Sequence, residues 1–169
     1  EIDNIVAWLW RERISDEAAR DRALSAKATA MTAHPEKTEG QVLFELHCAR
    51  CHTPRWPARG SAQLPNNGGE VDVVPGPAGS GRYGPALNVV SLERLFPDIE
   101  DQISFITIGA ADNVAYGEFA RLGNYGMPGF GRVLSEEEIR AISEYERSLD
   151  PAEQSTVQFT ELHRTKDDK

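Results

Sequence analysis

The cysteine side chains of this chain and one of its four histidines lie in a single short stretch, Cys48-Ala49-Arg50-Cys51-His52. Two thiols three residues apart, followed directly by an imidazole, provide what covalent attachment of a c-type haem requires: two thioether bonds to the porphyrin and one ligand to its iron. On a helix that advances about 100° per residue, these side chains share roughly one third of the circumference. We therefore predict that one helical face presents both sulfurs and the imidazole to a haem.

Two other kinds of site use a pair of cysteines at this spacing. A zinc site needs two further ligands, but the chain has no second cysteine pair, so His34, His47 or His163 would have to complete an improvised arrangement. A redox dithiol of the thioredoxin kind follows a strand, whereas the residues before Cys48 have a helical pattern. Both alternatives stay open, but haem attachment explains the motif better than either.

The length and the net charge of the chain limit the number of domains and the kinds of partner that it can have. The 169 residues can form one domain with a real core, or a smaller domain with extensions. The chain has 27 acidic and 18 basic side chains and a net charge of -9, which argues against nucleic acid as a partner. Such a surface favours basic partners, although an acidic surface that is merely solvated has the same composition.

The longest apolar run, residues 5–10, is too short to cross a bilayer, so we expect no membrane span in this chain. The sequence has neither an initiator Met nor a signal peptide and therefore reads as a processed or partial chain. Any membrane anchoring would then come from missing segments or from partner subunits.

The N-terminal region is predicted to be helical. A pattern Glu-Ile-x-x-Ile-x-x-aromatic occurs at residues 1–8 and again at residues 138–145. It is consistent with the end of an upstream copy of the same domain, and so with the C-terminal half of a tandem di-haem protein. A chance match between amphipathic helices and a short juxtamembrane helix are the alternatives. Residues 11–34 have only a thin apolar stripe, which predicts a solvated helix that ends at Pro35.

Two capping boxes predict the helices that must position the haem motif. Thr38-Glu39-Gly40-Gln41 opens a helix that leads directly into Cys48, and Ser135 with Glu138 opens a helix that runs through Leu149. Asp98, Glu100 and Asp101 suit the start of a middle helix, and Gly109 closes it. Residues 110–126 are predicted to be irregular, with Tyr116, Phe119 and Tyr125 as packing groups.

Pro and Gly recur throughout residues 53–83. We predict that this segment is an inserted loop with a short hairpin between residues 62–64 and 71–73. A second Gly/Pro-rich segment holds Met127, one of only two methionines. Core filling is the commonest use of a methionine. In this extended segment, downstream of a haem motif, the thioether of Met127 can instead reach a buried target.

The order of these pieces over roughly residues 38–150 resembles class I cytochrome c. The residues that carry this resemblance are C-x-x-C-H, G-P-x-L (residues 84–87), the middle helix, M-P-x-F (residues 127–130) and a terminal helix with Tyr145. The resemblance implies an all-α domain around one covalently bound haem c. The additional N-terminal helix and the long Gly/Pro-rich loop depart from the family pattern, as does Asn88, where many relatives have Gly.

The resemblance also implies the roles of the site residues. Cys48 and Cys51 would attach the haem, His52 would be its proximal ligand and Met127 its distal ligand, and the carbonyl of Pro85 would accept a hydrogen bond from the imidazole. Gly40 and Phe44 would pack across Tyr145, and the residues expected to line the pocket are Leu87, Ile106, Phe130 and Leu134. The predicted organisation is an N-terminal extension or linker over 1–37, a cytochrome domain over 38–150 and a polar tail over 151–169.

With both axial positions filled, no substrate reaches the iron, and one-electron transfer through the haem edge remains. We therefore expect an electron carrier rather than an enzyme, located outside the cytoplasm, in the periplasm or on the outer face of the membrane. The setting implied is a membrane-associated respiratory complex, with a quinol-cytochrome c reductase and a terminal oxidase as redox partners. The alternatives are a haem enzyme or a gas- or peroxide-responsive protein with a labile Met127, and a structural haem module.

Overall fold

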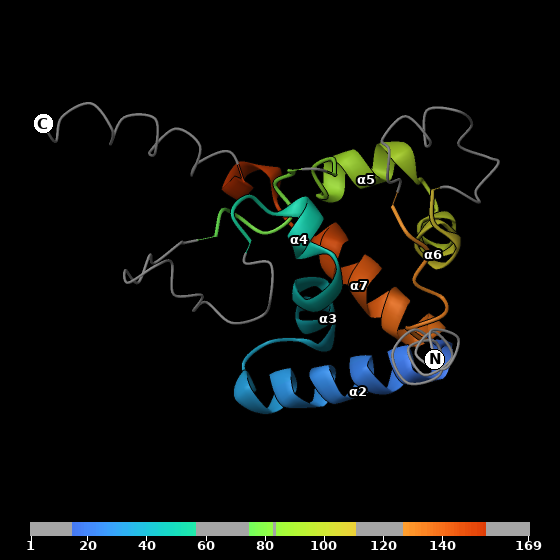
Figure 1. Cartoon of the computed structure of the whole chain (residues 1–169). Helices are drawn as coiled ribbons and strands as arrows, with labels where there is room; N and C mark the ends of the chain where they lie inside the picture. The colour runs from blue at the N-terminus through green and yellow to red at the C-terminus, as the bar shows by residue number, and fades with distance from the viewer. Residues whose placement is uncertain (1–14, 57–74, 83, 111–126, 155–169) are drawn as a thin grey trace, which may run out of the picture. The chain divides into compact units, whose positions relative to one another are not determined.

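The computed structural model describes residues 15–56, 75–82, 84–110 and 127–154 (Figure 1). The helices, in chain order, are α2 (Asp16–Ala33), α3 (Glu39–His47), α4 (Ala49–His52), α5 (Val89–Leu95), α6 (Ile99–Ile108) and α7 (Glu136–Ser148). The described residues form no strand, and a single isolated bridge pairs Gly109 with Pro128. The predicted all-α fold class is confirmed.

Several sequence-based expectations lie outside the described residues. They are the helix over residues 1–10, the hairpin between residues 62–64 and 71–73, the aromatic residues Tyr116, Phe119 and Tyr125, and the tail beyond residue 154. Of the helices in the described ranges, none combines the length and the apolar character needed to cross a membrane.

The chain divides into two compact units. The first unit comprises Glu1–Val42 and Asp98–Ser143, and the second comprises Leu43–Pro97 and Glu144–Lys169. Two of the three boundaries fall inside helices, so α3 and α7 each contribute residues to both units.

The core of the first unit is aliphatic and comes from α6, α7 and the segment between them. The large aliphatic side chains buried there are Ile103, Ile106, Leu134, Ile139 and Ile142, each at most 5% exposed. Helix α6 begins where predicted, because the carboxylate of its N-cap residue Asp98 accepts a hydrogen bond from the Glu100 amide at 3.0 Å.

The capping box at the start of α7 forms as the sequence predicts. The amide of Glu138 donates to Ser135 Oγ at 3.3 Å, and the amide of Ser135 donates to Glu138 Oε2 at 2.8 Å. Glu138 is only 6% exposed, so its carboxylate needs further partners.

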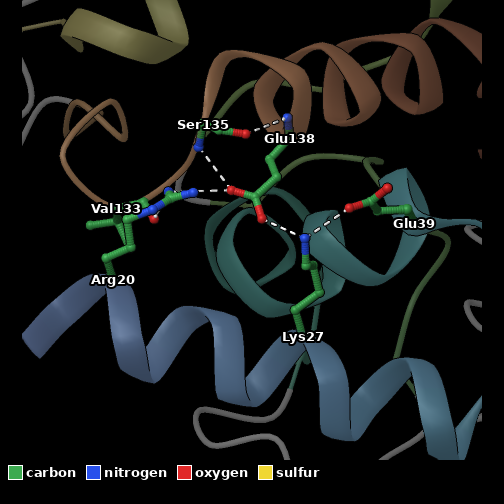
Figure 2. A network of polar contacts seen from close by, with 6 residues as sticks. All are labelled: Arg20, Lys27, Glu39, Val133, Ser135 and Glu138. Atoms are coloured by element: carbon green, nitrogen blue, oxygen red, sulfur yellow. Dashed lines mark hydrogen bonds and ion pairs between the residues drawn. The ribbon is translucent and has the colours of Figure 1, made fainter. Parts of the chain in front are cut away.

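Helix α2 supplies those partners (Figure 2). Lys27 Nζ bridges Glu138 Oε1 at 2.5 Å and Glu39 Oε1 at 2.9 Å, while Arg20 Nη1 donates to the carbonyl of Val133 at 2.8 Å and lies 3.4 Å from Glu138 Oε2. Burial alone would raise the pKa of Glu138, but the hydrogen bonds from Lys27 and from the Ser135 amide lower that pKa on balance. The hydrogen bond to Glu138 is the main reason why the pKa of Lys27 is raised.

The attachment of α2 is polar rather than apolar, because Ala23 is the only residue of this helix that is buried. The sequence predicts a solvated helix for residues 11–34. In the structure, two cations of that helix neutralise a carboxylate buried at the start of α7.

In the second unit, the rings of Phe44 and Tyr145 pack with their centroids 5.3 Å apart and their planes tilted by 56°, as the resemblance implied. Helix α5 was not expected from the sequence. Its N-cap is Asn88, whose side chain accepts a hydrogen bond from the amide of Ser91 at 2.9 Å. The residue that departs from the family pattern thus starts a helix.

Candidate haem site

The haem motif has a helical backbone. Cys48 is the N-cap residue of α4, and its carbonyl accepts hydrogen bonds from the amides of Cys51 at 3.0 Å and His52 at 3.1 Å. Cys48 is 4% exposed and His52 is 7% exposed, whereas Cys51 is exposed. Burial raises the pKa of the Cys48 thiol. One sulfur therefore lies inside the unit and the other at its surface.

The tautomer of His52 follows from its hydrogen bond. Nδ1 of His52 lies 2.8 Å from the carbonyl oxygen of Pro85, which can only accept, so Nδ1 carries the proton. Burial lowers the pKa of His52 and outweighs the opposite effect of the Pro85 carbonyl, so the ring is neutral at neutral pH. The lone pair is then on Nε2, as an imidazole that ligates a metal through this nitrogen requires.

Gly84 lets the imidazole lie against the backbone of the chain. A Cβ atom at Gly84 would lie only 2.6 Å from Nδ1 and 2.7 Å from Nε2 of His52. The amide of Gly84 also donates to the carbonyl of Cys51 at 2.9 Å. These contacts fix the plane of the ring, and with both cysteines on the same helical turn the residues fit a covalently attached haem.

Backbone amides connect residues 79–82 and 84–87, called loop 79–87 below, to the end of α4 or to each other. Gly81 donates to the carbonyl of His52 at 2.8 Å, and Gly79 donates to Thr53 Oγ1 at 3.1 Å. Leu87 donates to the carbonyl of Gly79 at 2.7 Å and so closes the loop at its base. The Pro85 carbonyl is thus part of a loop that is hydrogen-bonded at both its base and its tip.

Met127 belongs to the first unit, where its backbone is bonded to the end of α6. The amide of Ala110 donates to the Met127 carbonyl at 2.8 Å, and the amide of Phe130 donates to the carbonyl of Ile106 at 2.9 Å. The extended segment predicted from the sequence is therefore aligned along the last turn of a helix.

Two glycines permit this close approach of backbone to backbone. Gly109 has a φ of 84°, and a Cβ atom there would lie 2.7 Å from the Pro128 carbonyl carbon and 2.8 Å from the Met127 oxygen. A Cβ atom at Gly129 would lie 2.8 Å from the oxygen of Thr107. Neither position can take a side chain unless the two segments separate.

The structure places four of the five predicted site residues, Cys48, Cys51, His52 and Pro85, in the second unit, with direct contact between His52 and Pro85. Met127 lies in the first unit, and its role as second axial ligand stays a prediction. The roles of Gly84 and Gly109 were not predicted from the sequence. A glycine directly before Pro85, and one at the end of the middle helix, were the available signals.

The predicted lining residues divide into two kinds. Ile106 and Leu134 are buried, at 3% and 4% exposed, whereas Leu87 and Phe130 are partly exposed. In the described part of the chain, no three His, Cys, Asp or Glu side chains gather in a way that could hold a metal ion by themselves.

No curated protein and no solved structure matches this chain significantly. Residues 35–145 match the family described as cytochrome c oxidase, cbb3-type, subunit III. The matched residues include the haem motif, loop 79–87, the Met127 segment and most of α7. A cytochrome c domain implies a covalently bound haem c, in agreement with the fit of the residues around His52. Because the match extends over well more than half of the chain, this protein belongs to the cbb3-type subunit III family of cytochrome c domains.

Proposed function

We propose that this chain carries single electrons as a subunit or domain of a membrane-associated respiratory complex. The family match supports haem-based electron transfer related to the cbb3-type oxidase. The single observation that carries the proposal is the hydrogen bond from His52 Nδ1 to Pro85 O, because it leaves the Nε2 lone pair for iron. The bound haem would supply a metal that changes its charge by one electron without making or breaking bonds to substrate.

Each site residue has a distinct part in this proposal. Cys48 and Cys51 would hold the porphyrin by thioether bonds, and His52 would ligate iron from the proximal side. Met127 would occupy the distal position, where a thioether favours ferrous iron and raises the reduction potential. With both axial positions taken, the protein's contribution would be the potential and the docking of its partners.

The net charge of -9 supports partners with a basic docking surface, since opposite charges speed association. A quinol-cytochrome c reductase as donor and a terminal oxidase as acceptor are the classes that we propose. The corresponding location is outside the cytoplasm, where cytochrome c domains generally work.

The Met-to-iron charge-transfer band of the ferric protein tests the distal ligand. We expect the wild-type protein to show this long-wavelength band, and Met127→Ala to lose it and to have a lower reduction potential. Met31→Ala is the matched control, because Met31 is the only other methionine and lies on α2. This control should keep both the band and the potential.

The opposite result would favour the alternative function. A wild-type protein without the band that binds cyanide or carbon monoxide rapidly would have an accessible iron. It would then be a ligand-binding or catalytic haem protein, and the electron-carrier proposal would be wrong.

A further inference from the structure

The side chain of Gln154 is inserted into the second unit. Gln154 falls in the polar tail predicted from the sequence, but residues 151–154 form a helical turn and Gln154 is only 7% exposed. Its Nε2 donates to the carbonyls of Ala78 and Leu87, each at 2.9 Å, and its Oε1 accepts from Asn88 Nδ2 at 2.8 Å. Both N–H groups and the oxygen of the amide are therefore used.

The two carbonyls that bind Gln154 lie at the base of loop 79–87. Ala78 directly precedes the loop and Leu87 ends it, so the amide of Gln154 bridges the two sides of the base. Near its tip, the same loop carries Gly84 and Pro85, which contact the imidazole of His52. Gln154 thus holds the loop that holds His52.

Asn88 connects this arrangement to helix α5. Its Oδ1 caps the helix by accepting from the amide of Ser91, while its Nδ2 donates to Gln154. Asn88 is 6% exposed, so its amide, like that of Gln154, is shielded from water. A buried carbonyl or amide that loses its partner regains one when the backbone moves or when water enters. Loss of the Gln154 amide would therefore loosen the base of the loop, two residues from Pro85.

We propose that Gln154, held by Asn88, is a positioning residue that sets the hydrogen bond between His52 and Pro85 and thereby tunes the haem. This inference rests on the proposed role of His52 as proximal ligand. A strong bond from Nδ1 makes the imidazole a better donor to iron and favours the ferric state. A looser loop weakens that bond, and the reduction potential rises.

The test uses the haem-loaded protein and the variant Gln154→Met, which keeps the length of the side chain without its amide. We expect a higher reduction potential than in the wild type. We also expect the His52 Nδ1 proton, observed by NMR in the ferrous state, to exchange about fivefold faster. Ala152→Met is the matched control, since residue 152 is exposed on the same helical turn. The control should change neither quantity.

A second variant separates the loss of the hydrogen bond between Asn88 and Gln154 from a failure to fold. Asn88→Ser keeps a hydroxyl that can cap α5 but removes the amide that donates to Gln154. It should shift the potential and the exchange rate in the same direction by a smaller amount, and it replaces Gln154→Met if that variant does not fold.

The inference is overturned if a folded variant melts at a lower temperature yet keeps the wild-type potential and proton exchange rate. Such a result would make Gln154 merely structural. Failure of the proposed function would instead appear in the wild-type spectrum itself, before any variant is compared.

Discussion

The backbone of the chain holds His52 and Met127 in different ways. His52 is fixed through its side chain, by a hydrogen bond to Pro85 and by the contact of its ring with Gly84. At Met127 the structure fixes the main chain, whose carbonyl accepts from Ala110. An imidazole has two distinct nitrogens, so its tautomer must be selected, whereas a thioether carries no proton to place. For the proposed distal ligand, the path of the backbone is what matters.

The glycines on the two sides differ accordingly. Gly84 leaves room for a side chain, which can rotate, whereas Gly109 and Gly129 leave room for backbone atoms, which cannot move without breaking hydrogen bonds. The same substitution, glycine to alanine, should therefore cost more on the Met127 side.

The largest effect is expected for Gly109→Ala. Alanine there would meet the backbone of residues 127 and 128 and would also have to adopt a positive φ. We expect a loss of about 2–4 kcal/mol in the free energy of unfolding, measured by denaturant titration, together with a weaker Met-to-iron band. The matched control is Gly131→Ala, where the new Cβ would meet the Thr107 methyl group at 2.6 Å. Equal losses in the two variants would contradict the backbone argument.

Gly84→Ala should have the next largest effect, on the His52 side. The imidazole must turn away from the new methyl group and so weaken its bond to Pro85. We expect a loss of about 1–3 kcal/mol in stability and faster exchange of the Nδ1 proton, with the Met-to-iron band retained. Gly76→Ala is the control, because the atoms nearest to its Cβ would belong to the ring of Pro54, at 3.1 Å. If Gly84→Ala leaves proton exchange unchanged, Gly84 does not set the orientation of the ring.

The smallest effect concerns Glu138, whose ion pairs lie in the same unit as Met127. Glu138→Gln should lower the stability at neutral pH by about 1–2 kcal/mol, because the buried group loses its charge-assisted bond to Lys27. Glu136→Gln is the control, since Glu136 is 73% exposed and its ion pair with Arg140 is long, at 3.8 Å. A loss as large in the control would argue against a special role for the buried pair.

The pH dependence of this pair has a definite sign. The native pKa of Glu138 lies below the usual value of 4.5, so its contribution is present above that pH and is lost as the pH falls through the native pKa. The pKa of Lys27 is raised, so its contribution is present below pH 10.5 and is lost only as the pH rises through the native value. Acid should therefore reduce the difference in stability between the wild type and Glu138→Gln. Hydrogen exchange of the α2 amides, corrected for the intrinsic exchange rates, measures this difference.

The sequence by itself determined the local features. The C-x-x-C-H motif predicts a covalently bound haem c. The capping boxes at Thr38 and Ser135 determine where α3 and α7 begin, because a cap acts on amides within three residues.

Only the tertiary structure decided the contacts between residues distant in sequence. Lys27 reaches Glu138 across 111 residues, and Gln154 reaches Asn88 across 66 residues. Read alone, Lys27 is a solvated cation and Gln154 part of a polar tail, because nothing local distinguishes a polar side chain that finds a buried partner from one that faces water. Each becomes specific only when packing removes water from its partner and makes the hydrogen bond hard to replace.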